Sequence, residues 1–173
     1  MLENIRADFA AHGRQWGAQG FWAMAVYRFG RWRYQVKPAL LRKPLSAAYH
    51  ALFKYVQVLT GIKLPCEMTL GSGFIIEHAS GIVVSGFARF GGNCRIRNGV
   101  VIGLARVEES CAPQLGNSVD VGVGAKLLGN IRIGNHVRIG ANAVVISDVP
   151  DNCIAVGVRA VIKPRKHADG NTP

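Results

Sequence analysis

The chain has 173 residues, which suits one compact domain with a small appendage. Hydrophobic residues make up 49% and charged residues 18%, which excludes a disordered protein, and no apolar run is long enough to cross a bilayer. The net charge of +11 attracts polyanions such as nucleic acid, anionic lipid, acidic glycans or phosphate-bearing coenzymes, without choosing between them. The N-terminal MLENIRADF lacks the basic-then-apolar order of a secretory signal, so we expect a cytoplasmic protein.

Residues 1–61 are expected to form an α-helical N-terminal segment. The stretch 19–36 has apolar and aromatic residues at helical spacing with arginines among them. The stretch 38–61 predicts a second helix with a break, or a first-turn proline, at Pro44. Arginines among aromatic residues are also typical of surfaces that bind nucleic acid or lie close to a membrane. We favour helices packed on the rest of the protein or on a partner subunit.

From residue 64 onward, an aliphatic or aromatic residue returns every six positions. The spacing is interrupted by a slip of two before Phe90 and by a jump of thirteen before Leu115. Neither a helix, with a period near 3.6, nor a plain strand, with a period of 2, explains this pattern. The residues that open the hexads, called hexad openers below, are Leu64, Leu70, Ile76, Ile82, Phe90, Ile96, Ile102, Leu115, Val121, Leu127, Ile133, Ile139 and Val145.

Two further features accompany the hexad openers. From Val119 to Val149 an apolar residue also stands four positions after each opener, and glycine directly follows seven of the openers. A six-residue period of this kind predicts a short strand and a tight corner, repeated. Three sides close one triangular coil, so we predict about four coils in a β-helix domain at 62–163. An extended loop at 104–114 and a basic tail at 164–173 are expected outside the coils.

Within the ladder, the segment FIIEHASGIVVSG carries Glu77 and His78 side by side. The hexad openers and the residues four positions later are expected to point into the prism. His78 stands two residues after Ile76, outside both sets, so its imidazole is expected to point outward.

The four cysteines lie far apart and form no CxxC pair, which disfavours a zinc ribbon or a redox motif. We expect free thiols. Cys66, Cys94 and Cys153 are predicted to be small buried residues, whereas Cys111 falls in the loop.

Four segments together resemble the serine acetyltransferase family: GFWAMAVYRFGRWRY, EHASGIVVSG, VDVGVGAKLLGNIRIG and IGANAVVISDVPDNCIAVG. The short N-terminal part and the loop length are most similar to the exopolysaccharide, colanic-acid-type O-acetyltransferases of this family. The resemblance implies a mainly β fold, the left-handed parallel β-helix of hexapeptide repeats, preceded by a short α-helical segment. It also implies a homotrimer, or a dimer of trimers, that transfers acetyl from acetyl-CoA to a hydroxyl without a metal.

The resemblance also implies roles for individual residues. His78 matches the catalytic residue, the general base that takes the proton of the acceptor hydroxyl. Glu77 and Asp8 are expected to bind the acceptor. Small residues let the pantetheine of coenzyme A approach the backbone, and cations meet its phosphates. The cofactor-binding residues are expected to be Gly103, Val123, Gly124, Ala141, Arg159 and Lys163, with Arg165 and Lys166 as further cations.

Three features depart from the pattern of the family, and one of them is Glu77, which replaces an aspartate that helps bind serine there. Family enzymes carry an acid fifteen residues before the catalytic histidine, which orients its ring; Lys63 holds that place here and cannot accept the imidazole N–H. Glu108 or Glu109 from the loop is the candidate substitute, and both are further candidates for acceptor binding. The alternatives are that His78 works without a carboxylate partner or that the activity is weak. The Arg-His-Pro that grips the carboxylate of serine is replaced by the stretch CAPQLG, with Ala112 before the proline.

We therefore expect an acetyl-CoA-dependent O-acetyltransferase whose favoured acceptor is a sugar hydroxyl in exopolysaccharide biosynthesis. Serine O-acetylation for cysteine biosynthesis is the alternative, because most of the scaffold matches that enzyme. A non-catalytic hexapeptide-repeat scaffold is the second alternative. A zinc hydratase of this fold needs three histidines, and the hexad region offers His78 and His136 alone, so we expect no metal. Nucleic-acid binding rests on net charge alone and is not expected.

Overall fold

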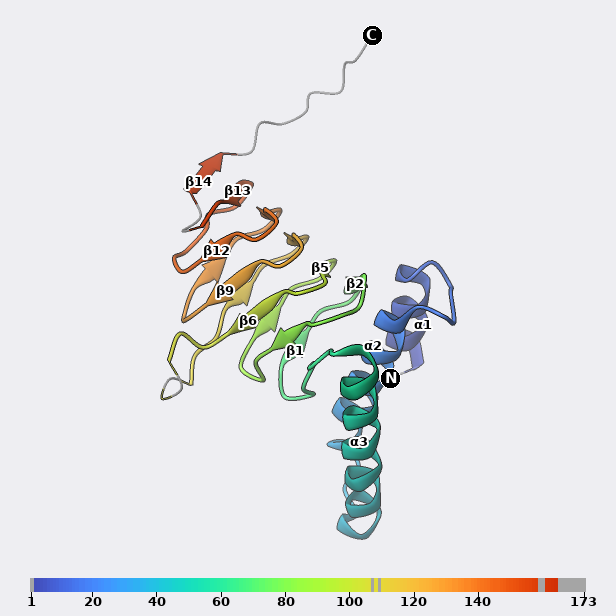
Figure 1. Cartoon of the computed structure of the whole chain (residues 1–173). Coiled ribbons are helices and arrows are strands. Elements are labelled where there is room, and N and C mark those ends of the chain that lie inside the picture. The colour runs from blue at the N-terminus through green and yellow to red at the C-terminus, as the bar shows by residue number, and fades with distance from the viewer. Residues whose placement is uncertain (1, 107, 109, 159–160, 165–173) are drawn as a thin grey trace.

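Three helices precede a prism of short strands (Figure 1). The computed structural model describes residues 2–106, 108, 110–158 and 161–164. The helices are α1 (Leu2–Ala11), α2 (Gln19–Arg33) and α3 (Ala39–Thr60), and they stand at one end of the prism. The strands are β1 (Thr69–Leu70), β2 (Ile75–Glu77), β3 (Val83–Val84), β4 (Arg89–Phe90), β5 (Arg95–Arg97), β6 (Val101–Gly103), β7 (Gln114–Leu115), β8 (Asp120–Val121), β9 (Lys126–Leu128), β10 (Arg132–Ile133), β11 (Arg138–Ile139), β12 (Val144–Val145), β13 (Cys153–Val156) and β14 (Val161–Pro164).

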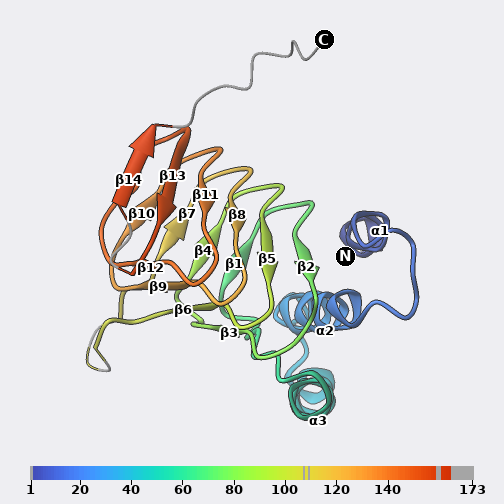
Figure 2. The ribbon, with the colours of Figure 1, turned by 45° about the horizontal axis from the view of Figure 1, so that its top comes forward.

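Each coil of the prism places one strand in each of three sheets (Figure 2). The first sheet holds β1, β4, β7 and β10, and the third sheet holds β3, β6, β9 and β12. The second sheet holds β2, β5, β8, β11 and β13, and β14 lies antiparallel along β13 at its end. The pairings between successive coils are parallel. The chain is a left-handed parallel β-helix preceded by helices, which confirms the predicted fold class.

The interior of the prism is filled by the residues that the hexad pattern singled out. All thirteen hexad openers are buried, with exposed fractions of 8% or less. Fully burying a Val, Leu or Ile side chain contributes about 1.5–3 kcal/mol. These stacked columns therefore supply most of the free energy that holds the coils together. The residues four positions after the later openers are buried with them: Val119, Ala125, Ile131, Val137, Ala143 and Val149.

The structure corrects the place of the two-residue slip. Ile102 of β6 is in register with Val84, not with Ile82. The extra residues therefore lie before β3: residues 78–82 separate β2 from β3, whereas residues 98–100 separate β5 from β6, two fewer. Ile82 and Val84 are both buried, so either could be read as the opener from the sequence. The slip belongs to the corner that begins with the candidate catalytic histidine.

Helices α2 and α3 form where the sequence predicts them, but the prediction for Pro44 is wrong. Helix α3 begins at Ala39 and continues through Pro44 without a break. A proline in the second turn removes a single helical hydrogen bond, which the packing of a long helix can offset. The helix ends at Gly61, whose φ of 68° is left-handed and whose N–H donates to the carbonyl of Gln57 at 2.9 Å. In the described part of the chain, no helix is both long and apolar enough to span a membrane.

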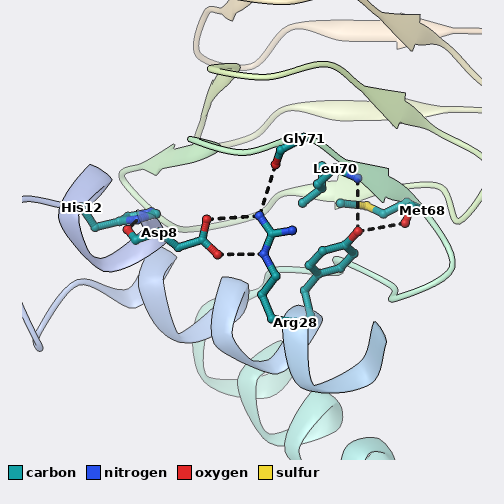
Figure 3. A network of polar contacts seen from close by, with 7 residues as sticks. Asp8, His12, Arg28, Met68, Leu70 and Gly71 are labelled. Atoms are coloured by element: carbon teal, nitrogen blue, oxygen red, sulfur yellow. Dashed lines mark hydrogen bonds and ion pairs between the residues drawn. The ribbon is translucent and has the colours of Figure 1, made fainter. Parts of the chain in front are cut away.

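Side chains of α1 and α2 cover the open edge of the first coil (Figure 3). No earlier coil pairs with this edge, so its backbone groups need other partners. The amide of Ile76 donates to His12 Nε2 at 3.2 Å, and Arg28 donates to the carbonyl of Gly71 at 3.2 Å. Since His12 Nε2 accepts, its Nδ1 carries the proton and donates to the carbonyl of Asp8 at 2.7 Å.

Two tyrosines also form hydrogen bonds with the backbone at this end, and together with His12 and Arg28 they make up what we call the polar cap. The hydroxyl of Tyr27 donates to the carbonyl of Met68 at 3.0 Å and accepts from the amide of Leu70 at 3.1 Å. The hydroxyl of Tyr49, from α3, accepts from the amide of Cys66 at 3.1 Å. Burial raises the pKa of both tyrosines, so both stay protonated at physiological pH. The helices and the first coil therefore form one hydrogen-bonded structure.

Gly71→Ala is expected to lower the free energy of unfolding by about 2 kcal/mol, because overpacking is destabilising. A Cβ at Gly71 would lie 2.5 Å from the carbonyl of Gly91 in the next coil. Gly103→Ala is the matched control, since nothing lies within 4 Å of a Cβ there. Urea unfolding of both variants measures the difference, and equal midpoints would contradict the expected clash.

The burial predicted for the cysteines is confirmed: Cys66, Cys94 and Cys153 are buried and Cys111 is exposed. Burial raises the pKa of the Cys94 thiol, which keeps it protonated and unreactive near neutral pH. We expect a chromogenic disulfide reagent at pH 8 to modify Cys111 rapidly and the other three thiols only after unfolding. Rapid reaction of a second thiol in the native protein would show that this core is not packed as described.

Candidate active site

His78 stands at the corner between the second and third sheets, directly after β2. Its side chain is exposed and its φ is 53°, in the left-handed region that residues other than glycine adopt uncommonly. The outward position predicted for His78 is therefore confirmed.

The backbone hydrogen bonds identify the extra residues. Glu77 is in register with Arg97. At the next position the ladder resumes with Ser80, because Gly99 N–H donates to the Ser80 carbonyl at 2.9 Å. His78 and Ala79 therefore have no counterpart in the second coil and form a two-residue insertion. We call it the His78 insertion.

Small and apolar residues stack beside the His78 insertion. The position of Ser80 is taken by Asn98 in the second coil, by Val123 in the third and by Ala141 in the fourth. The amide of Gly124 donates to the Asn98 carbonyl at 2.9 Å, and the amide of Asn142 to the Val123 carbonyl at 2.7 Å. Val123 and Ala141 are exposed. This corner thus carries an exposed imidazole in the first coil and small, exposed apolar side chains in the third and fourth coils.

Glu77 is held by two arginines on the outer face of the second sheet. Its Oε1 lies 3.3 Å from Arg95 Nη1, and its Oε2 lies 3.0 Å from Arg97 Nε. Arg97 also donates to Asp120 Oδ1 at 2.5 Å, and this hydrogen bond is the main reason that the pKa of Arg97 is raised. The network is half-exposed, so each pair contributes little stability. Its main effect is to neutralise the acid next to His78.

Lys63 lies on the third sheet, on the side of the prism that follows the His78 corner. It is exposed and bridges in parallel to Val83. Its amide donates to the Ile82 carbonyl at 2.8 Å and its carbonyl accepts from Val84 at 3.0 Å. The backbone of Lys63 is thus fixed in the ladder, and its exposed side chain puts a cation at the position where the family resemblance implies a carboxylate.

The residues expected to bind coenzyme A fall at two edges of the third sheet. Val123, Gly124 and Ala141 lie at the His78 corner, and Gly124 has a φ of 69° with the Asn142 side-chain oxygen packed over it. Gly103 ends β6 at the opposite edge, where the space beside it is open. Within one chain, the structure therefore does not bring Gly103 and the other three residues together.

The remaining expected residues are distributed differently. Figure 1 shows the loop that leaves the prism after β6. Glu108 is exposed in this loop, which follows the end of the third sheet that lies opposite to the His78 corner. Ala112, at the end of this loop, is buried, with 3% of its side chain exposed. Of Lys163 the structure describes the backbone in β14 alone. Four expected residues lie outside the described residues: Glu109, Arg159, Arg165 and Lys166.

Asp8 differs most from its expected place (Figure 3). Its side chain is 1% exposed, and its two carboxylate oxygens accept hydrogen bonds from Arg28 Nε at 2.9 Å and Nη2 at 3.2 Å. A carboxylate buried in this way is not free to contact an acceptor. The physical reason is the partner: Arg28 is also buried, and an unpaired charge there would cost several kcal/mol.

Sequence reasoning missed the arginines around Glu77. Arg95 and Arg97 flank the hexad opener Ile96, and 97 is twenty residues after 77. One coil has three sides of six residues each, and the His78 insertion adds two, so the equivalent position in the next coil lies twenty residues later. The periodicity could therefore have placed Arg97 beside Glu77 once the slip was assigned to the right corner. Among the residues that the structure describes, no group of three His, Cys, Asp or Glu side chains is arranged to hold a metal ion.

A left-handed prism of hexapeptide coils, with an exposed histidine inserted beside a column of small residues, defines a hexapeptide-repeat acyltransferase. Serine acetyltransferase of Helicobacter pylori strain J99 is 38% identical over 164 residues, which cover 92% of this chain and 92% of that protein. The protein provisionally named colanic acid biosynthesis acetyltransferase WcaB of Escherichia coli K12 is 30% identical over 168 residues, 94% of this chain and 98% of that protein. The chain belongs to the serine acetyltransferase family. No protein-family model matches it.

Other relatives are longer. Serine acetyltransferase of Synechococcus elongatus is 39% identical over 140 residues, and the chain spans 54% of its length. Among solved structures, serine acetyltransferase of Neisseria gonorrhoeae aligns with a TM-score of 0.81 and 28% identity over 99% of this chain and 71% of that one. The Brucella abortus enzyme in complex with coenzyme A aligns with a TM-score of 0.80 and 27% identity over 95% of this chain and 68% of that one.

Proposed function

We propose that the chain is an acetyl-CoA-dependent O-acetyltransferase with His78 as the general base. The observation that carries the proposal is the His78 insertion, which sets an exposed imidazole at the same corner of the prism as the exposed side chains of Val123 and Ala141 in the third and fourth coils. The Brucella abortus relative was solved with coenzyme A, which supports acetyl-CoA as the acyl donor. Small residues at this corner allow a long, thin substrate such as pantetheine to lie against the backbone.

The imidazole supplies the base that this reaction needs. A hydroxyl is a poor nucleophile at neutral pH, so His78 takes its proton while the oxygen attacks the thioester carbonyl. The tetrahedral intermediate then collapses, the bond to sulfur breaks, and the leaving thiolate takes the proton from the imidazolium. A backbone N–H beside the thioester oxygen stabilises the negative charge of the intermediate.

The site is shared between subunits of a homotrimer in this proposal. Gly103 and the loop with Glu108 lie at one edge of the third sheet, and His78 lies at the other. In the trimer, the Gly103 edge of the third sheet in one prism lies against the His78 edge of the third sheet in the neighbouring prism. Light scattering is expected to give three times the 18.6 kDa of one chain, or six times for a dimer of trimers. A monomeric mass would contradict the shared site.

The favoured acceptor is a sugar hydroxyl in exopolysaccharide biosynthesis. Two of the four acids expected to bind the acceptor are paired with arginines: Asp8 with Arg28, and Glu77 with Arg95 and Arg97. A paired carboxylate binds the ammonium group of an amino acid poorly, whereas a sugar carries no ammonium group to neutralise. The buried Ala112 likewise supplies no cation for a carboxylate. The WcaB relative, of nearly equal length, supports this choice.

Serine is the second candidate acceptor, since the Helicobacter pylori serine acetyltransferase matches over nearly its whole length. Release of coenzyme A, followed with a thiol reagent, separates the two. We expect saturable turnover with a nucleotide sugar or a lipid-linked saccharide and little with serine at millimolar concentration. Saturable acetylation of serine would overturn the sugar as acceptor and leave the role of His78 in place.

A third possibility is a scaffold without activity, and a measurement of acetyl-CoA binding distinguishes it from an enzyme. Calorimetry with acetyl-CoA is expected to show one site per chain. A protein that binds no acetyl-CoA would be a scaffold, and the proposed activity would be wrong.

A further inference from the structure

One face of α3 is packed and the opposite face is free (Figure 1, Figure 2). Tyr49 is buried, and Phe53 and Val56 pack against the core on the side of α2. The helix lies on the outer side of α2 and extends away from the prism. Its other face exposes large apolar side chains with exposed fractions between 44% and 84%: Leu40, Leu41, Leu52, Tyr55, Val58 and Leu59.

These side chains form a continuous stripe along the helix. Leu41, Ala48, Leu52, Tyr55 and Leu59 follow one another at spacings of seven, four, three and four, which places them on one face. A second row beside them makes the stripe wider than the two-position seam of a coiled coil. That row consists of Leu40, Ala47, Ala51 and Val58, all exposed.

The surroundings of the stripe are positively charged. Lys43, His50 and Lys54 are exposed and follow its edge at helical spacing. The sequence from 9 to 66 has no Asp or Glu at all. Seven exposed Lys and Arg residues lie in this span: Arg14, Arg31, Lys37, Arg42, Lys43, Lys54 and Lys63.

We propose that α3 docks the protein on the surface of an anionic lipid bilayer. The stripe enters the boundary between headgroups and acyl chains, and the cations along its edge meet the phosphates. Helices with a large apolar face and Lys or Arg beside it bind to membranes in this way. Tyr55, amphipathic and in the middle of the stripe, suits the interface between water and lipid.

A second copy of this helix fits the charges less well. Two α3 helices in contact through the stripe would bring Lys43 and Lys54 of each copy together, and α3 has no acidic residue to pair with them. Anionic headgroups neutralise the same cations. The charge on α3 therefore favours lipid over self-association.

Co-sedimentation with vesicles tests the proposal. The full chain is expected to bind vesicles of phosphatidylcholine with phosphatidylglycerol and to bind pure phosphatidylcholine at least about tenfold more weakly. The double variant Leu52→Ser and Leu59→Ser keeps every charge, and we expect it to lower the partition coefficient about tenfold or more. Lys43→Gln with Lys54→Gln is expected to cause a similar loss, which high salt reproduces in the unchanged protein.

Val158→Ser is the matched control, because Val158 is 84% exposed at the other end of the prism. It is expected to bind vesicles as the unchanged protein does. The proposal is overturned if the serine double variant still binds anionic vesicles fully, since net charge alone would then explain binding. It is also overturned if that variant has a lower mass in light scattering without lipid, because the stripe would then be a subunit interface.

Discussion

Replacing His78 by asparagine is expected to lower kcat for acetyl transfer by a factor of about a hundred or more, the usual contribution of a general base. Asparagine has no basic nitrogen, yet it tolerates a positive φ, as Asn93, Asn142 and Asn152 do in this chain. The insertion should therefore keep its shape. The dissociation constant of acetyl-CoA, measured by calorimetry, is expected to change less than about threefold.

His136→Asn is the control for this experiment. His136 is also exposed and also has a left-handed φ, of 55°, but it lies at a different corner of the prism. Its replacement should leave kcat unchanged. If the asparagine variant at 78 instead loses acetyl-CoA binding, His78 holds the acyl donor and is not the base.

The largest expected loss of stability comes from Asp8→Ala. Removing one partner of a buried ion pair leaves the other charge uncompensated, which costs about 3–5 kcal/mol. Arg28 is 8% exposed and has no other acid in its hydrogen bonds, which otherwise reach the Gly71 carbonyl. We expect the midpoint of thermal unfolding to fall by roughly 10 °C in calorimetry.

Two variants control for side effects of this change. Glu3→Ala, at an exposed acid of the same helix, should lower the melting temperature by less than about 1 °C. Asp8→Ala combined with Arg28→Met removes both charges and should recover part of the loss. A melting temperature for Asp8→Ala equal to that of the unchanged protein would show that the pair does not hold α1 and α2 together.

The prism could be predicted from the sequence because its period is carried by its core. Each side of a coil buries the same two positions, so the pattern from Leu64 to Val145 repeats what the interior requires. The exact corner of the slip could not be predicted, because Ile82 and Val84 are both aliphatic and both buried. Register between coils, which the backbone hydrogen bonds define, decides between them.

The candidate site could be predicted in part. The outward position of His78 could be predicted because the residue stands outside both sets of apolar positions, and its role as a base came from the resemblance to the family. The place of Asp8 could not be found, because its partner Arg28 is twenty residues away on another helix and their contact depends on how α1 and α2 meet. The same holds for Lys63 and Glu108, whose distances from His78 depend on how the chain is coiled. Local spacing carries no information on such contacts.

The polar cap on the first coil has a consequence for assembly. The end of a stack of parallel strands has unpaired backbone groups, which can pair with a strand of another molecule. Here His12, Tyr27 and Arg28 already occupy backbone groups of β1, β2 and the turn between them. The cap therefore blocks fibre-like growth from that end. Contacts between molecules are left to the sides of the prism, where the His78 imidazole is exposed.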